Sequence, residues 1–157
     1  MTVEVGSKPA IVNKMERIAG VAGGTMPFRF EVSTNSEHTI TSITVETSEE
    51  GCTARKTVEA NEQIYLFEDA LEIPQTAAPH ADDLVITVTA LNDIGEQSVW
   101  TGTACVIKGV YIYGDATVSK SNKEYSMPMV QTPSSNEFTF KTYVEAAGDG
   151  FLLWTGD

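Results

Sequence analysis

The most constraining feature of this chain is a hydrophobic period of two residues that recurs in several separate segments. It is clearest in residues 26–32, where one face carries Met26, Phe28, Phe30 and Val32. Arg29 and Glu31 lie on the opposite face of the same segment. Such alternation is typical of an antiparallel strand with one face in a core and the other in water. The pattern predicts an all-β protein.

A second alternating segment is Thr39–Thr47, in which Ile43 and Val45 share the inward face. Ile40 is out of register with them, which indicates a β-bulge or the end of a strand. Asn61–Leu71 has two readings. Asn61 could cap a short helix, or residues 63–67 could form a strand that crosses to a second sheet. The strand is the reading that we favour.

A hairpin is predicted for residues 83–107. Asp83–Leu91 alternates between apolar residues and threonines, and Gln97–Ile107 is rich in Thr and Val, which pleated surfaces favour. The segment between them, Asn92-Asp-Ile-Gly95, supplies residues that tolerate positive φ. The preceding loop, Pro74–Ala81, contains two prolines and is therefore excluded from a central strand.

Strands at this spacing, separated by turn residues, predict a β-sandwich or barrel. Residues 8–107 supply six or seven strands, which fits an immunoglobulin-like β-sandwich over residues 1–107. Lys108-Gly109 is the expected hinge. Residues 108–157 are expected to form a partial antiparallel β-domain, because their short aromatic strands are too few to bury a core alone. This tail is expected either to dock on the sandwich or to be the front half of a longer domain.

Composition limits the partners. The 157 residues include 22 acidic and 10 basic side chains, for a formal net charge of −12. Such a surface repels phosphate backbones and anionic lipid headgroups, so nucleic acid and direct membrane docking are not expected. Met1–Ser7 shows no signal-peptide pattern. Cys52 and Cys105 could form a bridge, but two buried thiols are the interpretation that we favour.

The sequence contains no recognisable catalytic pattern. His38 and His80 lie in predicted loops without ligands at metal spacing, and no nucleophile elbow is present. None of the acidic pairs is singled out as a glycosidase pair. We therefore expect a protein that is not an enzyme, with no catalytic residues, no metal site and no cofactor.

Several segments resemble known surface proteins. Leu84–Ser98 resembles the closing hairpin of Ig-like and PKD-like modules of bacterial surface proteins. Val110–Thr117, Ser126–Met129, Glu137–Phe140 and Val144–Gly148 resemble the opening of a glycan-binding repeat of the SusE/SusF-type outer-membrane lipoproteins of polysaccharide-utilisation systems. In that family an N-terminal Ig-like domain precedes starch-binding-type β-domains, which agrees with the order expected here.

The resemblance implies a non-catalytic, exported cell-surface protein that binds an oligo- or polysaccharide and uses the Ig-like domain as a spacer. It also implies a possible outer-membrane transport complex as partner and a lipid anchor outside this sequence. Sugar-binding faces need aromatic rings and nearby polar groups, which makes the candidates Tyr111, Tyr113, Asp115, Asn122, Tyr125 and Trp154. Trp100 is a further aromatic that we expect to fill the core or the interdomain space. The alternative function is a structural or adhesive module that binds protein or self-associates through its tail strands.

Overall fold

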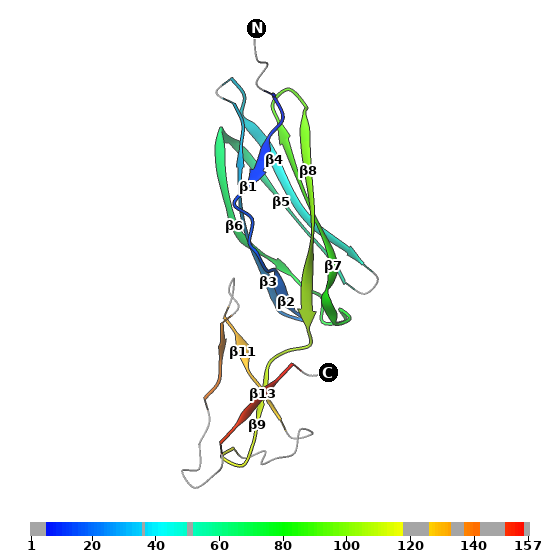
Figure 1. Cartoon of the computed structure of the whole chain (residues 1–157), viewed down its shortest axis with the longest axis vertical. Helices are drawn as coiled ribbons and strands as arrows, with labels where there is room; N and C mark the ends of the chain where they lie inside the picture. The colour runs from blue at the N-terminus through cyan, green and yellow to red at the C-terminus, as the bar shows by residue number, and fades with distance from the viewer. Residues whose placement is uncertain are drawn as a thin grey trace.

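The computed structural model describes residues 6–35, 37–49, 52–117, 126–132, 137–141 and 150–155. All the regular elements in these ranges are β-strands, so the predicted all-β fold is confirmed. Figure 1 shows a two-sheet body at one end of the molecule and a tail of short strands at the other. No helix of the described chain is long and apolar enough to cross a membrane.

Two sheets form the sandwich. The first has the order β1-β3-β6, with bounds Ala10–Val12, Thr25–Ser33 and Ile64–Glu72. The second has the order β2-β8-β7-β4-β5, with bounds Ala19–Val21, Gln97–Ile107, His80–Asn92, Ile40–Glu49 and Cys52–Glu62. The predicted sandwich is therefore present, with eight strands where six or seven were expected.

The core lies between these sheets and follows the alternation in the sequence. The side chains of Met26, Phe28, Phe30 and Val32 on β3 are all buried. The facing strands contribute Ile43 and Val45 of β4 and Leu84, Ile86, Val88 and Ala90 of β7. The ring of Phe30 stacks on that of Phe67 with centroids 4.8 Å apart. Each of the larger side chains contributes about 1.5–3 kcal/mol by leaving water.

The ambiguous segment is strand β6, which pairs with β3 in antiparallel register from Thr25↔Glu72 to Ser33↔Ile64. It lies in the other sheet from its sequence neighbour β5, as the strand interpretation required. The Lys56 ammonium on β5 forms an ion pair with the Asp69 carboxylate on β6, which links the two sheets at one edge of the sandwich. Burial raises the pKa of Asp69, but the hydrogen bonds from Lys56 and the Ala70 N–H, together with the Lys56 charge, lower it below its ordinary value.

The expected bulge and hairpin are both present. The register of β4 shifts between Ile40 and Ser42. Strands β7 and β8 pair in antiparallel fashion and are joined by the predicted turn, in which the Asn92 side chain accepts a hydrogen bond from the Glu96 N–H at 2.8 Å. Gly95 has a φ of +81° in this turn. The left-handed region favours glycine, which explains its place here.

Strand β2 pairs in parallel with β8, from Ala19↔Cys105 to Val21↔Ile107. Backbone hydrogen bonds extend this pairing at both ends, since the Cys105 N–H donates to Ile18 O and the Ala22 N–H donates to Ile107 O, each at 2.9 Å. The turn after β2 therefore lies beside the end of β8, where the chain leaves the sandwich.

The tail forms two small sheets. One has the order β10-β9-β13, with bounds Met127–Pro128, Tyr111–Tyr113 and Leu152–Trp154. The other pairs β11 with β12, with bounds Val130–Gln131 and Phe138–Thr139. The division of the chain into domains 1–107 and 108–157 stays a prediction, although the described tail does contact the sandwich, as set out below.

Candidate functional site

Three of the predicted sugar-binding aromatics lie on one face of the β10-β9-β13 sheet. Trp154 pairs with Tyr111, and Leu152 pairs with Tyr113. Directly paired residues of antiparallel strands project from the same face, and Tyr111 and Tyr113 are two residues apart on one strand. We call Tyr111, Tyr113 and Trp154 the aromatic face. The rings of Tyr111 and Trp154 are 5.5 Å apart with a tilt of 40°, and all three side chains are half-buried.

Close backbone contact beyond β9 holds this sheet together. Gly114 has a φ of +134°. A Cβ atom at this position would lie 2.7 Å from both the carbonyl oxygen of Gly150 and the Cα of Phe151. The Ala116 N–H donates to the same Gly150 oxygen at 3.0 Å. The glycine of the Gly114-Asp-Ala segment is therefore required by geometry, because no other residue fits against the chain entering β13.

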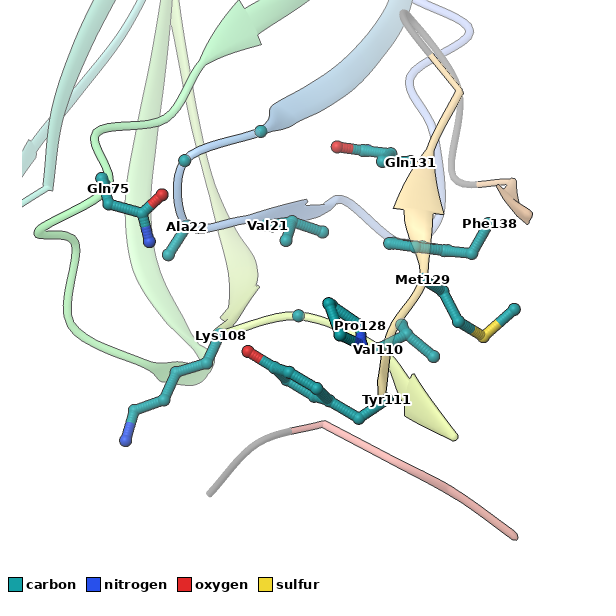
Figure 2. A pocket seen from close by; sticks show the side chains of 13 residues that line it. Val21, Ala22, Gln75, Lys108, Val110, Tyr111, Pro128, Met129, Gln131 and Phe138 are labelled. Carbon is teal, nitrogen blue, oxygen red and sulfur yellow. The ribbon is translucent and has the colours of Figure 1, made fainter. Parts of the chain in front are cut away.

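A cavity of about 240 Å³ lies where the sandwich meets the tail, and we call it the junction cavity (Figure 2). On one side is the turn that follows β2, and on the other are β9, β10 and β11. Its labelled side chains in Figure 2 are Val21, Ala22, Gln75, Lys108, Val110, Tyr111, Pro128, Met129, Gln131 and Phe138. The Tyr111 hydroxyl points toward the linker, while the Lys108 side chain extends from that linker toward the outside.

Gln131 attaches the tail to the sandwich at this cavity. Its side-chain Nε2 donates to the Thr25 carbonyl at 3.0 Å, and its Oε1 accepts from the Thr25 N–H at 2.9 Å. The side-chain amide of Gln131 thus pairs with both the N–H and the C=O of Thr25, as the backbone of a neighbouring strand would. We call this pair of hydrogen bonds the Gln131 clamp. Gly24 leaves room for it, because a Cβ there would lie 2.5 Å from Gln131 Oε1.

A second cavity, of about 550 Å³, lies near the start of β7 and the end of β8. We call it the His80 cavity; its lining comprises Pro79, His80, Ala81, Cys105, Val106, Ile107, Lys108 and Thr155. Nδ1 of His80 lies 3.1 Å from the Asp83 carboxylate. Within the described chain, Nε2 of His80 is buried and has no hydrogen-bond partner. Cys105 is a free, half-buried thiol rather than a fully buried one.

The other predicted residues do not belong to the aromatic face as defined or lie outside the described residues. Asp115 is exposed in the turn after β9. Asn122 and Tyr125 lie outside the described residues. Trp100 packs against the sandwich core, with its ring 6.3 Å from that of Phe28 and the Lys14 ammonium 5.7 Å from its centroid. In the part of the chain that the structure describes, no three His, Cys, Asp or Glu side chains are placed to hold a metal ion.

Sequence reasoning missed the polar residues around the junction. Gln75, Lys108 and Gln131 line the junction cavity, and none of them was a candidate. The available signal was the expected hinge at Lys108-Gly109, since residues beside a hinge between two β-units lie at the boundary between them. Gln131 had no such signal, because its partner Thr25 is 106 positions away in the sequence.

Comparisons with known proteins give little support for a particular family. No family model matches the chain, and no curated protein matches it. Among solved structures, a superoxide reductase (neelaredoxin) from Ignicoccus hospitalis is similar, with 18% identity and a TM-score of 0.37 over 63% of this chain and 79% of that one.

This similarity corrects one prediction. The matching protein is an enzyme, which contradicts the prediction that the present chain is not one, and we withdraw that prediction. A likeness of 18% identity and a TM-score of 0.37 assigns no reaction to the present chain.

Proposed function

We propose that this chain is part of a cell-surface protein that binds an oligo- or polysaccharide through the aromatic face of its tail. The observation that carries the proposal is the placement of Tyr111, Tyr113 and Trp154 on one face of the β10-β9-β13 sheet. Trp154 is far from the two tyrosines in the sequence, yet the fold brings the three rings together and leaves each only half-buried.

The chemistry of the face suits a sugar. Aromatic rings offer flat apolar surface to the C–H faces of a pyranose, and polar groups at the edge take its hydroxyls. Gln75 is exposed at the junction cavity, and Asp115 is exposed in the turn after β9. A saccharide on the aromatic face would have both kinds of group within the same region of the molecule.

The wider setting is part of the same proposal. The resemblance of the tail to the SusE/SusF-type repeats favours an outer-membrane protein of a polysaccharide-utilisation system, held by a lipid anchor outside this sequence. In that setting the sandwich is a spacer, and an outer-membrane transport complex is the partner. The order of the units, an all-β sandwich followed by a β-rich tail with an aromatic face, supports this setting.

Tryptophan fluorescence can test the site directly, because the chain has two tryptophans, Trp100 and Trp154. In a Trp100→Phe variant the emission reports on Trp154 alone, so a bound glycan should change its intensity or wavelength. In a Trp154→Phe variant the emission reports on the core-packed Trp100, which serves as the matched control and should not respond.

Affinity should be measured by calorimetry with a panel of soluble oligosaccharides. We expect Tyr113→Ala and Trp154→Ala each to weaken binding by roughly tenfold, corresponding to about 1.4 kcal/mol of lost contact. Trp100→Phe should bind with unchanged affinity. Heat and fluorescence changes that are absent with every glycan would refute the proposal.

A second candidate is self-association through the tail, and a specific observation favours it. β13 is an edge strand whose neighbour within the described sheet is β9. Phe151, Leu152 and Leu153 are each more than half exposed, at 54%, 59% and 56%. Exposed apolar edge strands are sites of strand addition. Size-exclusion chromatography with light scattering distinguishes the two, since a concentration-dependent dimer abolished by Leu152→Lys would support self-association and a monomer at all concentrations would exclude it.

A further inference from the structure

Lys108 occupies a distinctive position because it lines both the junction cavity and the His80 cavity. It follows the last residue of β8, and its side chain is exposed. Three other described cations have carboxylate partners: Arg17 with Asp82, Arg55 with Glu46, and Lys56 with Asp69. Among the described residues Lys108 has none, so its ammonium is available to an external anion.

The two cavities also differ in charge from the rest of the molecule. The chain has 22 acidic residues, yet the residues that line these cavities in the described structure include neither Asp nor Glu. The Asp83 carboxylate contacts His80 Nδ1 but is not itself part of the cavity lining. An anion beside Lys108 is therefore not repelled by the cavity walls.

Other groups around Lys108 suit hydroxyls rather than a bare inorganic anion. The His80 ring contacts the Asp83 carboxylate through Nδ1, at 3.1 Å. Nε2 of the same ring has no hydrogen-bond partner in the described chain, but it is buried rather than open to the cavity. Tyr111 and Gln75 line the junction cavity together with Lys108, and the Tyr111 hydroxyl points toward the Lys108-Gly109 segment.

The volume of the His80 cavity is suitable for a bound saccharide. Small-molecule sites are typically about 300–1,000 Å³, and the His80 cavity, of about 550 Å³, lies in that range. The junction cavity, of about 240 Å³, is large enough for part of a chain. A saccharide that extends from one cavity into the other lies next to Lys108, because Lys108 lines both cavities.

We infer that the saccharide bound by this protein is acidic, and that Lys108 pairs with a carboxylate of a uronic-acid unit at the junction between sandwich and tail. The inference rests on the proposed function and specifies its ligand class. The overall charge of −12 repels an acidic saccharide at long range. Repulsion from distant surface charges is screened beyond about 8 Å at physiological ionic strength, whereas the ammonium contact is direct.

The test uses the whole chain and matched pairs of oligosaccharides. Oligogalacturonate, oligoglucuronate and alginate oligosaccharides would each be compared with the same compound after methyl esterification of its carboxylates, which removes the charge and keeps the ring. We expect at least one acidic form to bind about tenfold more tightly than its ester, with the difference shrinking at high salt. Lys108→Gln should abolish that difference by weakening binding of the acidic form.

Lys8→Gln is the matched control, since Lys8 is an exposed lysine before β1, and it should retain the preference. Thermal unfolding of both variants checks that neither change affects folding. Binding of neutral or esterified saccharides with no acidic preference would overturn the inference and leave the proposed function intact. An acidic preference that survives Lys108→Gln would overturn the role of Lys108. Absence of binding by every saccharide, acidic or neutral, would instead remove the proposed function itself.

Discussion

The Gln131 clamp predicts a measurable coupling between the tail and the sandwich. Its two hydrogen bonds, at 2.9 and 3.0 Å, both end on Thr25. A hydrogen bond contributes about 0.5–1.5 kcal/mol net. Gln131→Ala should therefore weaken the free energy of association between the tail and the sandwich by about 1–3 kcal/mol. An equilibrium shifts by about 5- to 150-fold over that range.

Amide hydrogen exchange reads out this change at a single proton. The Thr25 N–H donates to the Gln131 side chain, so its exchange rate should rise by the same 5- to 150-fold in Gln131→Ala. The amide of Phe30, in the middle of β3, should keep its wild-type rate because its pairing with β6 is untouched. Gly24→Ala should act in the same direction, since the added Cβ would displace the Gln131 amide.

Gln75→Ala is the control for the clamp. Gln75 lies beside the same turn but is exposed and belongs to the sandwich, so its removal should leave Thr25 exchange unchanged. A Thr25 rate in Gln131→Ala within twofold of the wild type would show that the clamp does not hold the tail. An equal acceleration in Gln75→Ala would show that the turn, and not the clamp, protects this amide.

Three further predictions concern the tail, the core and the sheet edge. Gly114→Ala should break the β9–β13 contact at a cost of about 1–3 kcal/mol. In a Trp100→Phe background this change should appear as a red shift of the Trp154 emission. Gly6→Ala is the control and should cause no red shift, because a Cβ at Gly6 meets open space. Phe30→Ala should lower the free energy of unfolding in urea by about 3–5 kcal/mol, because the ring is fully buried against Phe67, whereas the exposed Arg29→Ala should change it by less than about 0.5 kcal/mol. The pKa of Asp69 is lowered in the folded protein, so the ionised carboxylate stabilises the fold. This contribution to the free energy of unfolding is fully present above the ordinary carboxyl pKa, and it is lost as the pH falls through the lowered pKa of the folded state. Wild type should therefore exceed Asp69→Asn in stability by at most about 1 kcal/mol at neutral pH, since the pair is about one-third exposed, and the two unfolding curves should converge in acid; a constant gap would contradict this.

The strands that the sequence predicted best are those with a run of alternating apolar residues on one face. β3, β4 and β7 meet this condition, and β8, predicted from its Thr and Val content, has the expected bounds Gln97–Ile107. β5 was missed because it is an edge strand. Its alternating positions include Ala54, Lys56 and Val58, and such small or amphipathic side chains give a weak signal. β1 and β2 have three residues each, which is too short for a period to be recognised.

The candidate site was only partly predictable for a different reason. Tyr111 and Tyr113 share a face of one strand, which follows from the period of two alone. Their association with Trp154 depends on the pairing of β9 with β13 across about forty intervening residues, and no local pattern specifies that register. Gly114 illustrates the same limit. The sequence shows a glycine in a turn, whereas its requirement comes from the backbone of Gly150 and Phe151.

The parallel pairing of β2 with β8 has a mechanical consequence. A stretching force applied before β2 and after β8 pulls these two strands in opposite directions along their common axis. The hydrogen bonds between Ala19–Val21 and Cys105–Ile107 then bear the load together in shear, rather than separating one after another as at the end of a hairpin. With this arrangement the sandwich transmits tension from its N-terminal side to the tail before its core is exposed.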